Sequence, residues 1–92
     1  MCGIAGIVCW AGPRDPSALA EPSRRLAHRG PDDAGALSWR PGARAVTSDD
    51  PRDLPPGNVL LAHRRLSILD LSDAAAQPMS DPAGRRHLVF NG

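Results

Sequence analysis

The segment directly behind Met1 is a short apolar run that ends at a turn signal. Residues Cys2 to Trp10 read Cys-Gly-Ile-Ala-Gly-Ile-Val-Cys-Trp, and Ala11-Gly12-Pro13 follows at once. An apolar run of this length, bounded by Gly and Pro, is typical of a buried strand with a turn behind it. Glycine weakens a strand, so Gly3 and Gly6 indicate positions where backbone or ligand approaches closely. The sequence therefore predicts a sheet to which this run contributes a buried strand.

A helix is predicted in the segment after this turn. Ser17 can cap it, it runs to about His28, and Gly30-Pro31 stops it. Three residues at helical spacing form its buried face: Leu19, Ser23 and Leu26. Proline is unfavourable inside a helix, so Pro22 predicts a kink or a later start.

The remaining chain alternates between apolar runs and irregular stretches. Strands are predicted at 34–39, 59–62, 66–69 and 87–90. Residues 40–58 hold four of the ten prolines, which indicates an irregular surface loop with a short strand at 43–47, and residues 72–86 are also loop-like. The last strand runs into Asn91-Gly92, a strong signal for a hairpin turn. Residues 1–92 are therefore expected to be the beginning of a longer protein.

Composition and charge argue against two classes of partner. The share of hydrophobic residues is 41%, yet no window approaches the ~20 apolar residues of a membrane span. The net charge is +1, and the arginines are scattered among acids with few aromatic residues, which does not favour a nucleic-acid surface. With no secretory signal visible, a cytoplasmic protein is expected.

The cysteines and histidines predict neither a disulfide nor a metal site. In one strand the sulfurs of Cys2 and Cys9 start roughly 23 Å apart and on opposite faces. A disulfide needs Cα atoms within about 7 Å, so both thiols are expected to stay reduced. Three histidines stand alone, without partners at zinc spacing: His28, His63 and His87. The adjacent carboxylates of Asp32-Asp33 point apart on an extended chain and supply too few ligands for a cation.

Cys2 is a candidate nucleophile because of its position. Removal of Met1 is favoured by a small second residue, and it would leave a thiol and a free α-amine on Cys2. Such an amine has a pKa near 8, so an appreciable fraction can accept a proton at neutral pH. It can take the proton of the thiol directly or through one water. A cysteine at this position is nonetheless usually incidental, and Cys9 is expected to be a small buried side chain.

Five motifs together resemble a known family. Met1–Ile7 resembles the opening of class II glutamine amidotransferases, whose glutaminase domain belongs to the N-terminal nucleophile hydrolases. Four further motifs, in order, resemble glutamine-hydrolysing asparagine synthetase: His28–Asp33, Leu61–Ser72, Gln77–Met79 and Val89–Gly92. Branches that make glucosamine phosphate or phosphoribosylamine carry different residues after the His-Arg-Gly. The set covers the whole chain apart from the loop near 40–58.

The resemblance implies an α+β fold. Residues 1–92 would be the amino-terminal portion of a glutaminase domain, and hence a partial, truncated four-layer α/β/β/α sandwich. The downstream part of that domain and a synthetase domain would follow. By itself, this portion is expected to fold poorly and to lack activity, because half of the sandwich that covers its apolar faces would be absent.

The resemblance also assigns the site. It makes Cys2 the nucleophile that attacks the side-chain amide of glutamine, with its own α-amine as base. Arg65 would bind the α-carboxylate of glutamine, a task that suits a planar guanidinium. The Asn91 side-chain amide and the Gly92 backbone N–H would form the oxyanion hole. Taken alone, Arg65 fits a surface ion pair, and Asn91-Gly92 fits a plain hairpin turn.

Two motif segments are expected to support this site, and the histidines are not. Ile68–Ser72 would line the glutamine site through backbone contacts, and His28–Asp33 would shape a loop beside it. His63 and His87 receive no role, since the α-amine already serves as base.

The implied reaction hydrolyses glutamine to glutamate and ammonia through a Cys2 thioester. The ammonia would then amidate aspartate to asparagine, with Mg-ATP bound in the synthetase domain. Residues 1–92 contain no phosphate-binding Gly-rich loop, so no cofactor is expected within them. The complete enzyme is expected to bind glutamine, aspartate and ATP, and to form a homodimer. Two alternatives stay open: another class II amidotransferase with the same front end, and a non-catalytic interaction module with an incidental Cys2.

Overall fold

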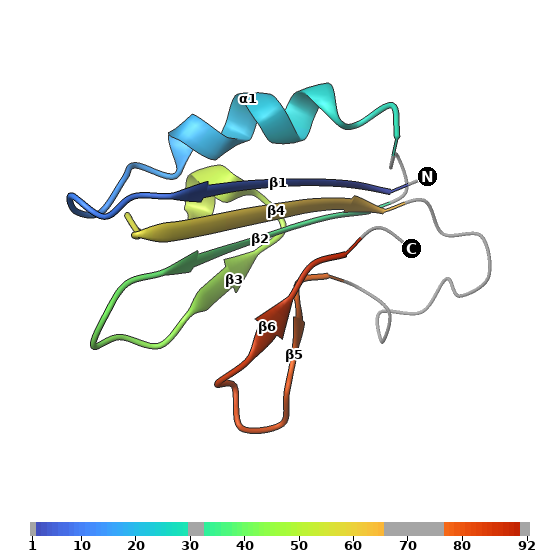
Figure 1. Ribbon diagram of the computed structural model, residues 1–92. Coiled ribbons are helices and arrows are strands. Elements are labelled where there is room, and N and C mark those ends of the chain that lie inside the picture. The colour runs from blue at the N-terminus through green and yellow to red at the C-terminus, as the bar shows by residue number, and fades with distance from the viewer. Residues whose placement is uncertain (1, 30–32, 66–76, 91–92) are drawn as a thin grey trace.

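The computed structural model describes residues 2–29, 33–65 and 77–90 (Figure 1). In chain order the elements are β1 (Gly3–Val8), α1 (Ser17–Arg25), β2 (Asp33–Trp39), β3 (Val46–Ser48), the 3-10 helix η1 (Pro51–Asp53), β4 (Val59–Arg65), β5 (Met79–Ser80) and β6 (His87–Leu88). Within these described ranges, no helix is long and apolar enough to cross a membrane.

Strand β4 lies at the centre of a four-stranded antiparallel sheet in the order β1-β4-β2-β3. On one side it pairs with β1, from Gly3 opposite Arg64 to Val8 opposite Val59. On its other side it pairs with β2, from Asp33 opposite Arg65 to Trp39 opposite Val59. β1 and β2 are therefore not neighbours in the sheet, although they are consecutive strands in the chain, and α1 connects them across β4 (Figure 1).

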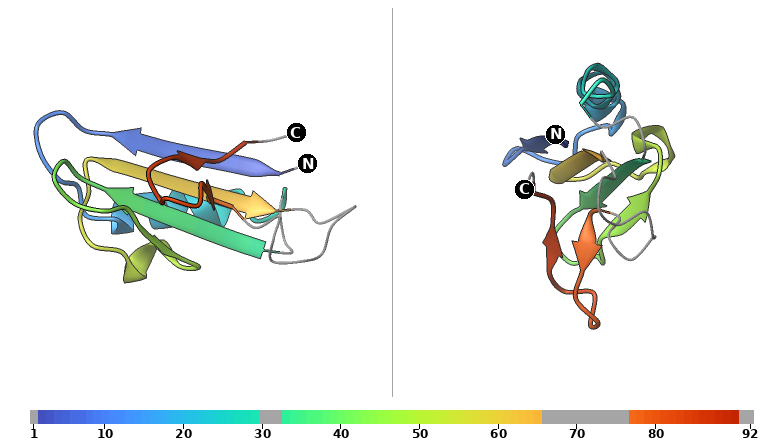
Figure 2. Two further views of the ribbon diagram at one scale, coloured as in Figure 1. Left: turned by 90° about the horizontal axis from the view of Figure 1, so that it is seen from below. Right: turned by 90° about the vertical axis from the view of Figure 1, so that its right-hand side faces the viewer.

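Helix α1 covers one face of this sheet and the hairpin β5–β6 lies on the other side (Figure 2). The core lies beneath the helix and consists of small and branched aliphatic side chains: Leu19, Ala36, Leu54, Leu60 and Ala62, with Ala5 and Ile7 packed against them. Side chains alternate between the two faces along a strand. Residues 60, 62 and 64 of β4 therefore face α1, and residues 61, 63 and 65 face away from it.

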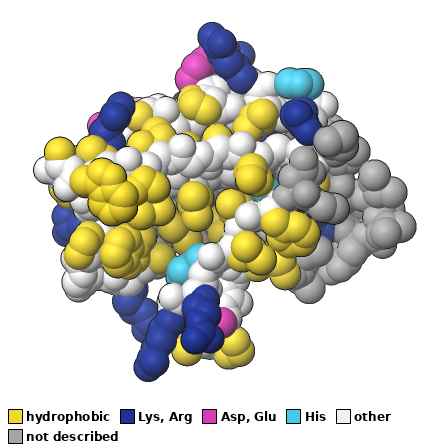
Figure 3. All heavy atoms as spheres, in the orientation of Figure 1, with side chains coloured by type: hydrophobic (Ala, Val, Ile, Leu, Met, Phe, Trp, Pro, Cys, Tyr) yellow, Lys and Arg dark blue, Asp and Glu magenta, His cyan; other side chains and the backbone are white. Residues whose placement is uncertain are grey.

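Glycines allow close approach on both faces of the sheet. A Cβ at Gly3 would lie 3.1 Å from the Leu26 Cβ, which is how the end of α1 comes down onto β1. On the opposite face, a Cβ at Gly35 would overlap the backbone carbonyl of Gln77. The chain before β5 thus lies directly against β2. Below α1 in the space-filling view, apolar side chains gather over the sheet and the hairpin (Figure 3).

The predicted helix is present, with different ends. It begins at Ser17, but Ser17 is not its cap: Pro16 occupies the cap position, and the Ser17 N–H donates to the Asp15 carboxylate at 2.9 Å. This bond lowers the pKa of Asp15. The helix ends at Arg25, short of His28, and Pro22 lies inside it without delaying its start. Leu19 and Ser23 are buried as predicted, whereas Leu26 lies just past the last helical residue and is only half-buried.

The predicted strands are confirmed in position and corrected in length. β1 and β2 match their predicted runs closely in position, whereas β4 continues through the arginine pair that was expected to end it. The prediction that β1 is a buried strand is wrong: it lies at the edge of the sheet, and only one of its faces is covered by α1, so Ile4 and Val8 on the other face are exposed. The short strand expected at 43–47 lies at Val46–Ser48, and η1, capped by the Asp50 side chain, was not predicted. The loop-like stretch 72–86 contains β5, and the strand expected at 87–90 is only two residues long. The strand predicted at 66–69 lies outside the described residues.

The element content is mixed α and β: among the described residues, one α-helix packs on a four-stranded sheet, and a two-stranded sheet lies on the other side (Figure 2). The four-layer sandwich therefore remains a prediction.

Candidate active site

Cys2 and Arg65 come together at one end of the sheet. The β1–β4 ladder ends with Gly3 opposite Arg64, so Cys2 and Arg65 are the next residues at this end of the two strands. If the register were continued by one step, Cys2 would stand opposite Arg65. Residues directly opposite in an antiparallel pair have their side chains on the same face, with Cβ atoms about 4.5–5.5 Å apart. The Cys2 thiol is unbridged and half-buried. The sheet thus brings a thiol and a guanidinium from distant parts of the sequence to the same end of the sheet.

Arg65 is both buried and ion-paired. It is only 6% exposed, and its Nη1 lies 3.8 Å from Oδ2 of Asp33, its cross-strand neighbour on β2. A buried charge is tolerated when it is paired, so Asp33 holds the guanidinium at the Cys2 end of the sheet. The alternative interpretation of Arg65, a surface residue in an ion pair, is therefore wrong about the surface position and correct about the ion pair. Within the described ranges, no group of three or more His, Cys, Asp or Glu side chains could hold a metal ion.

His63 lies two residues before Arg65 on the same face of β4. It is 1% exposed, and its Nε2 lies 3.0 Å from the carbonyl oxygen of Phe90. A carbonyl can only accept, so Nε2 carries the proton. Burial lowers the pKa of His63, while the bond to Phe90 and the charge of Asp33 act in the opposite direction. His63 is therefore a neutral donor at pH 7.

Phe90, whose carbonyl oxygen accepts from His63, is also bonded to Gln77. The Gln77 side-chain carbonyl accepts the backbone N–H of Phe90 at 2.7 Å. Phe90 is thus bonded through its N–H and its C=O to side chains of two separate segments. The chain after β6 runs back toward the end of the sheet where β1 begins and β4 ends (Figures 1 and 2). Asn91 and Gly92, predicted to form the oxyanion hole, lie outside the described residues, as does Ile68–Ser72.

The other cysteine and histidines lie elsewhere. Cys9 is unbridged and half-buried just after β1, at the opposite end from Cys2, where its backbone bonds to Asn58. The His28 Nδ1 lies 2.7 Å from the Arg25 carbonyl oxygen behind α1. The two ring nitrogens of His87 lie near Ser80 and Gly84 within the hairpin. Cys9 is therefore far from Cys2 along β1, and His28 lies beyond the end of α1, on the helix side of the sheet (Figure 1).

Sequence reasoning missed Asp33, His63 and Gln77. Each stands inside a motif that carried the family resemblance, but nothing local to the sequence indicates a partner for any of them. Their partners, Arg65 and Phe90, are distant in the chain and become neighbours only through strand pairing and the return of the chain after β6.

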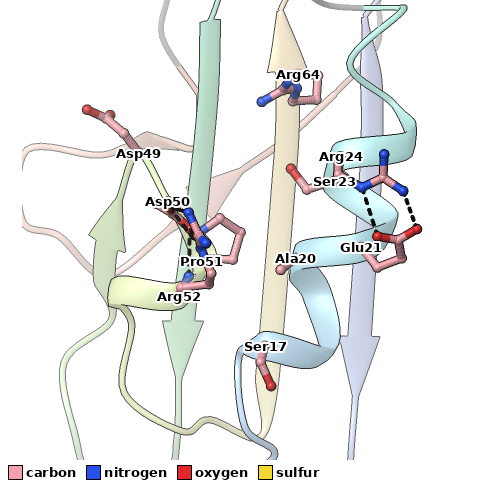
Figure 4. Close-up of a pocket in the computed structure, with 10 residues that line it drawn as sticks. All are labelled: Ser17, Ala20, Glu21, Ser23, Arg24, Asp49, Asp50, Pro51, Arg52 and Arg64. Atoms are coloured by element: carbon pink, nitrogen blue, oxygen red, sulfur yellow. Dashed lines mark hydrogen bonds and ion pairs between the residues drawn. The ribbon is translucent and has the colours of Figure 1, made fainter.

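A separate pocket lies on the helix face, between α1, η1 and β4 (Figure 4). Arg64 lines it from β4, and the other charged side chains largely pair with one another: Glu21 with Arg24 and Arg25, and Asp50 with Arg52. These pairs lower the pKa values of Glu21 and Asp50 to about 2. The pocket is on the opposite face of the sheet from Cys2 and Arg65.

Comparison with known proteins assigns the sequence to a family. The model of the glutamine amidotransferase domain matches residues 1–92. The chain belongs to this family.

Two curated relatives are similar over nearly the whole chain. One, from Methanocaldococcus jannaschii, is named "Putative asparagine synthetase [glutamine-hydrolyzing] 2" and is 32% identical over 90 residues, which are 98% of this chain and 15% of that protein. The other, "Amidase chry2" of Gibberella zeae, is 33% identical over 103 aligned residues, covering all of this chain and 13% of that protein. The chain thus spans less than a sixth of the length of either relative. No solved structure matches it significantly.

Proposed function

We propose that this glutamine amidotransferase domain hydrolyses glutamine with Cys2 as an N-terminal nucleophile. The observation that supports the proposal is the register of β1 and β4, whose last pair, Gly3 and Arg64, directly adjoins Cys2 and Arg65. In a family that acts on glutamine, a thiol beside a buried guanidinium provides the two groups that the substrate needs. The thiol can attack the side-chain amide, and the guanidinium can bind the α-carboxylate through two parallel hydrogen bonds.

The reaction proceeds through a thioester. After removal of Met1, the α-amine of Cys2 takes the thiol proton as the sulfur bonds to the amide carbon of glutamine. Negative charge develops on the amide oxygen, and the proposed donors are the Asn91 side chain and the Gly92 N–H. Collapse breaks the carbon–nitrogen bond, and the amine returns its proton to the leaving nitrogen, which departs as ammonia. Water then attacks the thioester, releasing glutamate and restoring the thiol.

For the use of the ammonia, we propose amidation of aspartate to asparagine with Mg-ATP. The similarity to the Methanocaldococcus jannaschii protein supports this choice. The equal similarity to the Gibberella zeae amidase favours a second candidate, an amidotransferase with a different acceptor. Supplying the full chain with glutamine, ATP and aspartate distinguishes them: asparagine forms in the first case only. The homodimer and the cytoplasmic location remain predictions of the family resemblance.

The proposal is tested on the full chain with a glutamine-analogue chloroketone. Intact mass should show that Met1 is absent, and peptide mapping should place the label on Cys2. Cys2→Ala should abolish both labelling and glutamine hydrolysis, whereas Cys9→Ala should leave both at the wild-type level. Labelling that persists in Cys2→Ala would refute the nucleophile and favour a non-catalytic interaction module.

A further inference from the structure

We propose that the pocket on the helix face of the sheet binds the phosphate group of a small organic molecule, through Arg64 and Ser23. The pocket lies between α1, η1 and β4 and has a volume of about 430 Å³. Sites for small molecules typically have volumes of about 300–1,000 Å³. The pocket is on the opposite face of the sheet from Cys2 and Arg65, so the proposal does not depend on glutamine hydrolysis.

The first support is a buried donor of Arg64. The Nε of Arg64 is buried, and no described residue accepts a hydrogen bond from it. Most buried polar groups in proteins have a hydrogen-bond partner, and an exception calls for an explanation such as a bound ion. The Nε–H and one Nη–H of a guanidinium are parallel and can bind two oxygens of one anion. An oxyanion on this edge of Arg64 would satisfy the buried Nε.

The second support is the pairing of the charges around Arg64. Glu21 pairs with Arg24 at 2.6 Å, and Asp50 pairs with Arg52 at 2.7 Å. The arginines lower the pKa values of both carboxyl groups to about 2, so both carboxylates are ionised and paired at neutral pH. Among the described residues, Arg64 has no ion-pair partner. Its positive charge is therefore available to a ligand in the pocket.

The directions of the side chains also favour an anion. The Arg64 guanidinium and the Ser23 hydroxyl both extend into the space between α1 and η1, whereas the Asp49 carboxylate is directed away from it (Figure 4). Ser23 is 4% exposed, and its hydroxyl bonds to no other described residue. A serine inside a helix usually points to solvent or bonds to the carbonyl four residues before it. The buried Ser23 hydroxyl is therefore a second donor for a ligand.

These donors suit a phosphate better than a carboxylate. A phosphate group has three acceptor oxygens, so two can accept from the guanidinium of Arg64 and the third from Ser23. A carboxylate has two oxygens, and the bidentate edge of Arg64 would engage both. Two apolar side chains, Ala20 and Pro51, also line the pocket and can contact the carbon atoms of a phosphate monoester.

The test follows the reaction of Arg64 with phenylglyoxal in the full chain, measured by peptide mass mapping. The reagent modifies guanidinium groups, so bound phosphate should protect Arg64. At ten times its Kd, inorganic phosphate should slow this modification about 10-fold by mass action. Phenyl phosphate should protect at lower concentrations than inorganic phosphate, and acetate should protect less than either. Arg14, which is exposed and outside the pocket, is the matched arginine control and should react equally with and without phosphate.

Ser23→Ala tests the second donor with the same readout. A hydrogen bond to a charged group is lost, so the phosphate concentration that protects Arg64 should rise about 10- to 100-fold. Ser17→Ala, on the same helix but with its hydroxyl directed away from Arg64 (Figure 4), should leave that concentration unchanged.

Three results would overturn the inference. They are no protection of Arg64 by inorganic phosphate, equal protection of Arg14, and equal protection by acetate and phosphate. Cys2→Ala should retain full protection of Arg64, because the pocket is separate from the proposed nucleophile. Failure of the proposed glutamine hydrolysis and failure of phosphate binding are therefore distinguishable.

Discussion

Arg64 and Arg65 are successive residues of β4, yet the sheet sends them into different surroundings. Arg64 is half-buried on the helix face, where it lines the pocket between α1 and η1 (Figure 4). Arg65 is 6% exposed on the opposite face, beside Asp33 and one step beyond the Gly3–Arg64 pair. In an extended strand the side-chain period is two, so neighbours in sequence belong to opposite faces.

This comparison assigns different roles to the two faces of the sheet, one in stability and the other in glutamine hydrolysis. The helix face buries the aliphatic core, and the charged groups around its pocket pair among themselves at the surface. The opposite face carries Cys2, His63 and Arg65 toward one end of the sheet. Stability should therefore depend mainly on the first face and glutamine hydrolysis on the second.

The largest expected effect concerns the helix face. Leu19 is fully buried between α1 and the sheet, so Leu19→Ala leaves a cavity and should lower the free energy of unfolding by about 2–5 kcal/mol. Val8→Ala, on the opposite face and 55% exposed, should change it by less than about 0.5 kcal/mol. Urea unfolding of the full chain measures both. Equal losses of unfolding free energy in the two variants would show that stability does not depend mainly on the helix face.

The next effect distinguishes the two arginines. Arg65→Lys keeps a positive charge beside Asp33 but loses the planar fork that binds a carboxylate bidentately. A hydrogen bond to a charged group contributes about 1.5–3 kcal/mol, so kcat/KM for glutamine should fall about 10- to 100-fold, mainly through KM.

Arg64→Lys is the matched control, because it makes the same change one residue away on the other face. It should leave kcat/KM within about twofold of wild type, because Arg64 lines the pocket on the helix face, away from the face that carries Arg65. Steady-state kinetics with glutamine decide the comparison. If both variants lose the same activity, the assignment of Arg65 from strand register is wrong.

Much of the sheet could be predicted because its signals are local. The apolar run behind Met1 and the run 34–39 each predicted a strand. The helical spacing of Leu19 and Ser23 predicted the buried side of the helix. The arginine pair misled the prediction, since charges interrupt an apolar run. In the structure β4 continues through them, because Asp33 pairs with one and the helix-face pocket receives the other.

The unpredicted parts depend on contacts between distant segments. β5 is two residues long, too short for a periodic signal, and it pairs with β6, the shortened form of the strand predicted at 87–90. The bonds that Phe90 makes to His63 and Gln77 cannot be inferred from spacing, because the chain must first return to the sheet. The family motifs contained both residues without saying what they bind.

The smallest expected effect tests His63 through pH. Burial lowers the pKa of His63 from 6.5. Between the folded and the unfolded pKa, the ring is therefore protonated in the unfolded chain and neutral in the folded chain. The contribution of His63 to stability is therefore complete above the unfolded pKa and is lost as pH falls below about 6.5 toward the folded pKa. Asp33 and Arg65, the charged groups near it on β2 and β4, act in opposite directions on this pKa and partly offset each other.

The measurement compares the free energy of unfolding of wild type and His63→Gln between pH 7.5 and pH 5. The gap between them should narrow by up to about 1.4 kcal/mol for each unit by which the pKa is lowered, because only wild type carries the titrating ring. His87→Gln, in the hairpin, should follow wild type throughout. A constant gap between wild type and His63→Gln would mean that the ring titrates as it does in the unfolded chain. The opposite face would then lack the buried, neutral donor that holds Phe90.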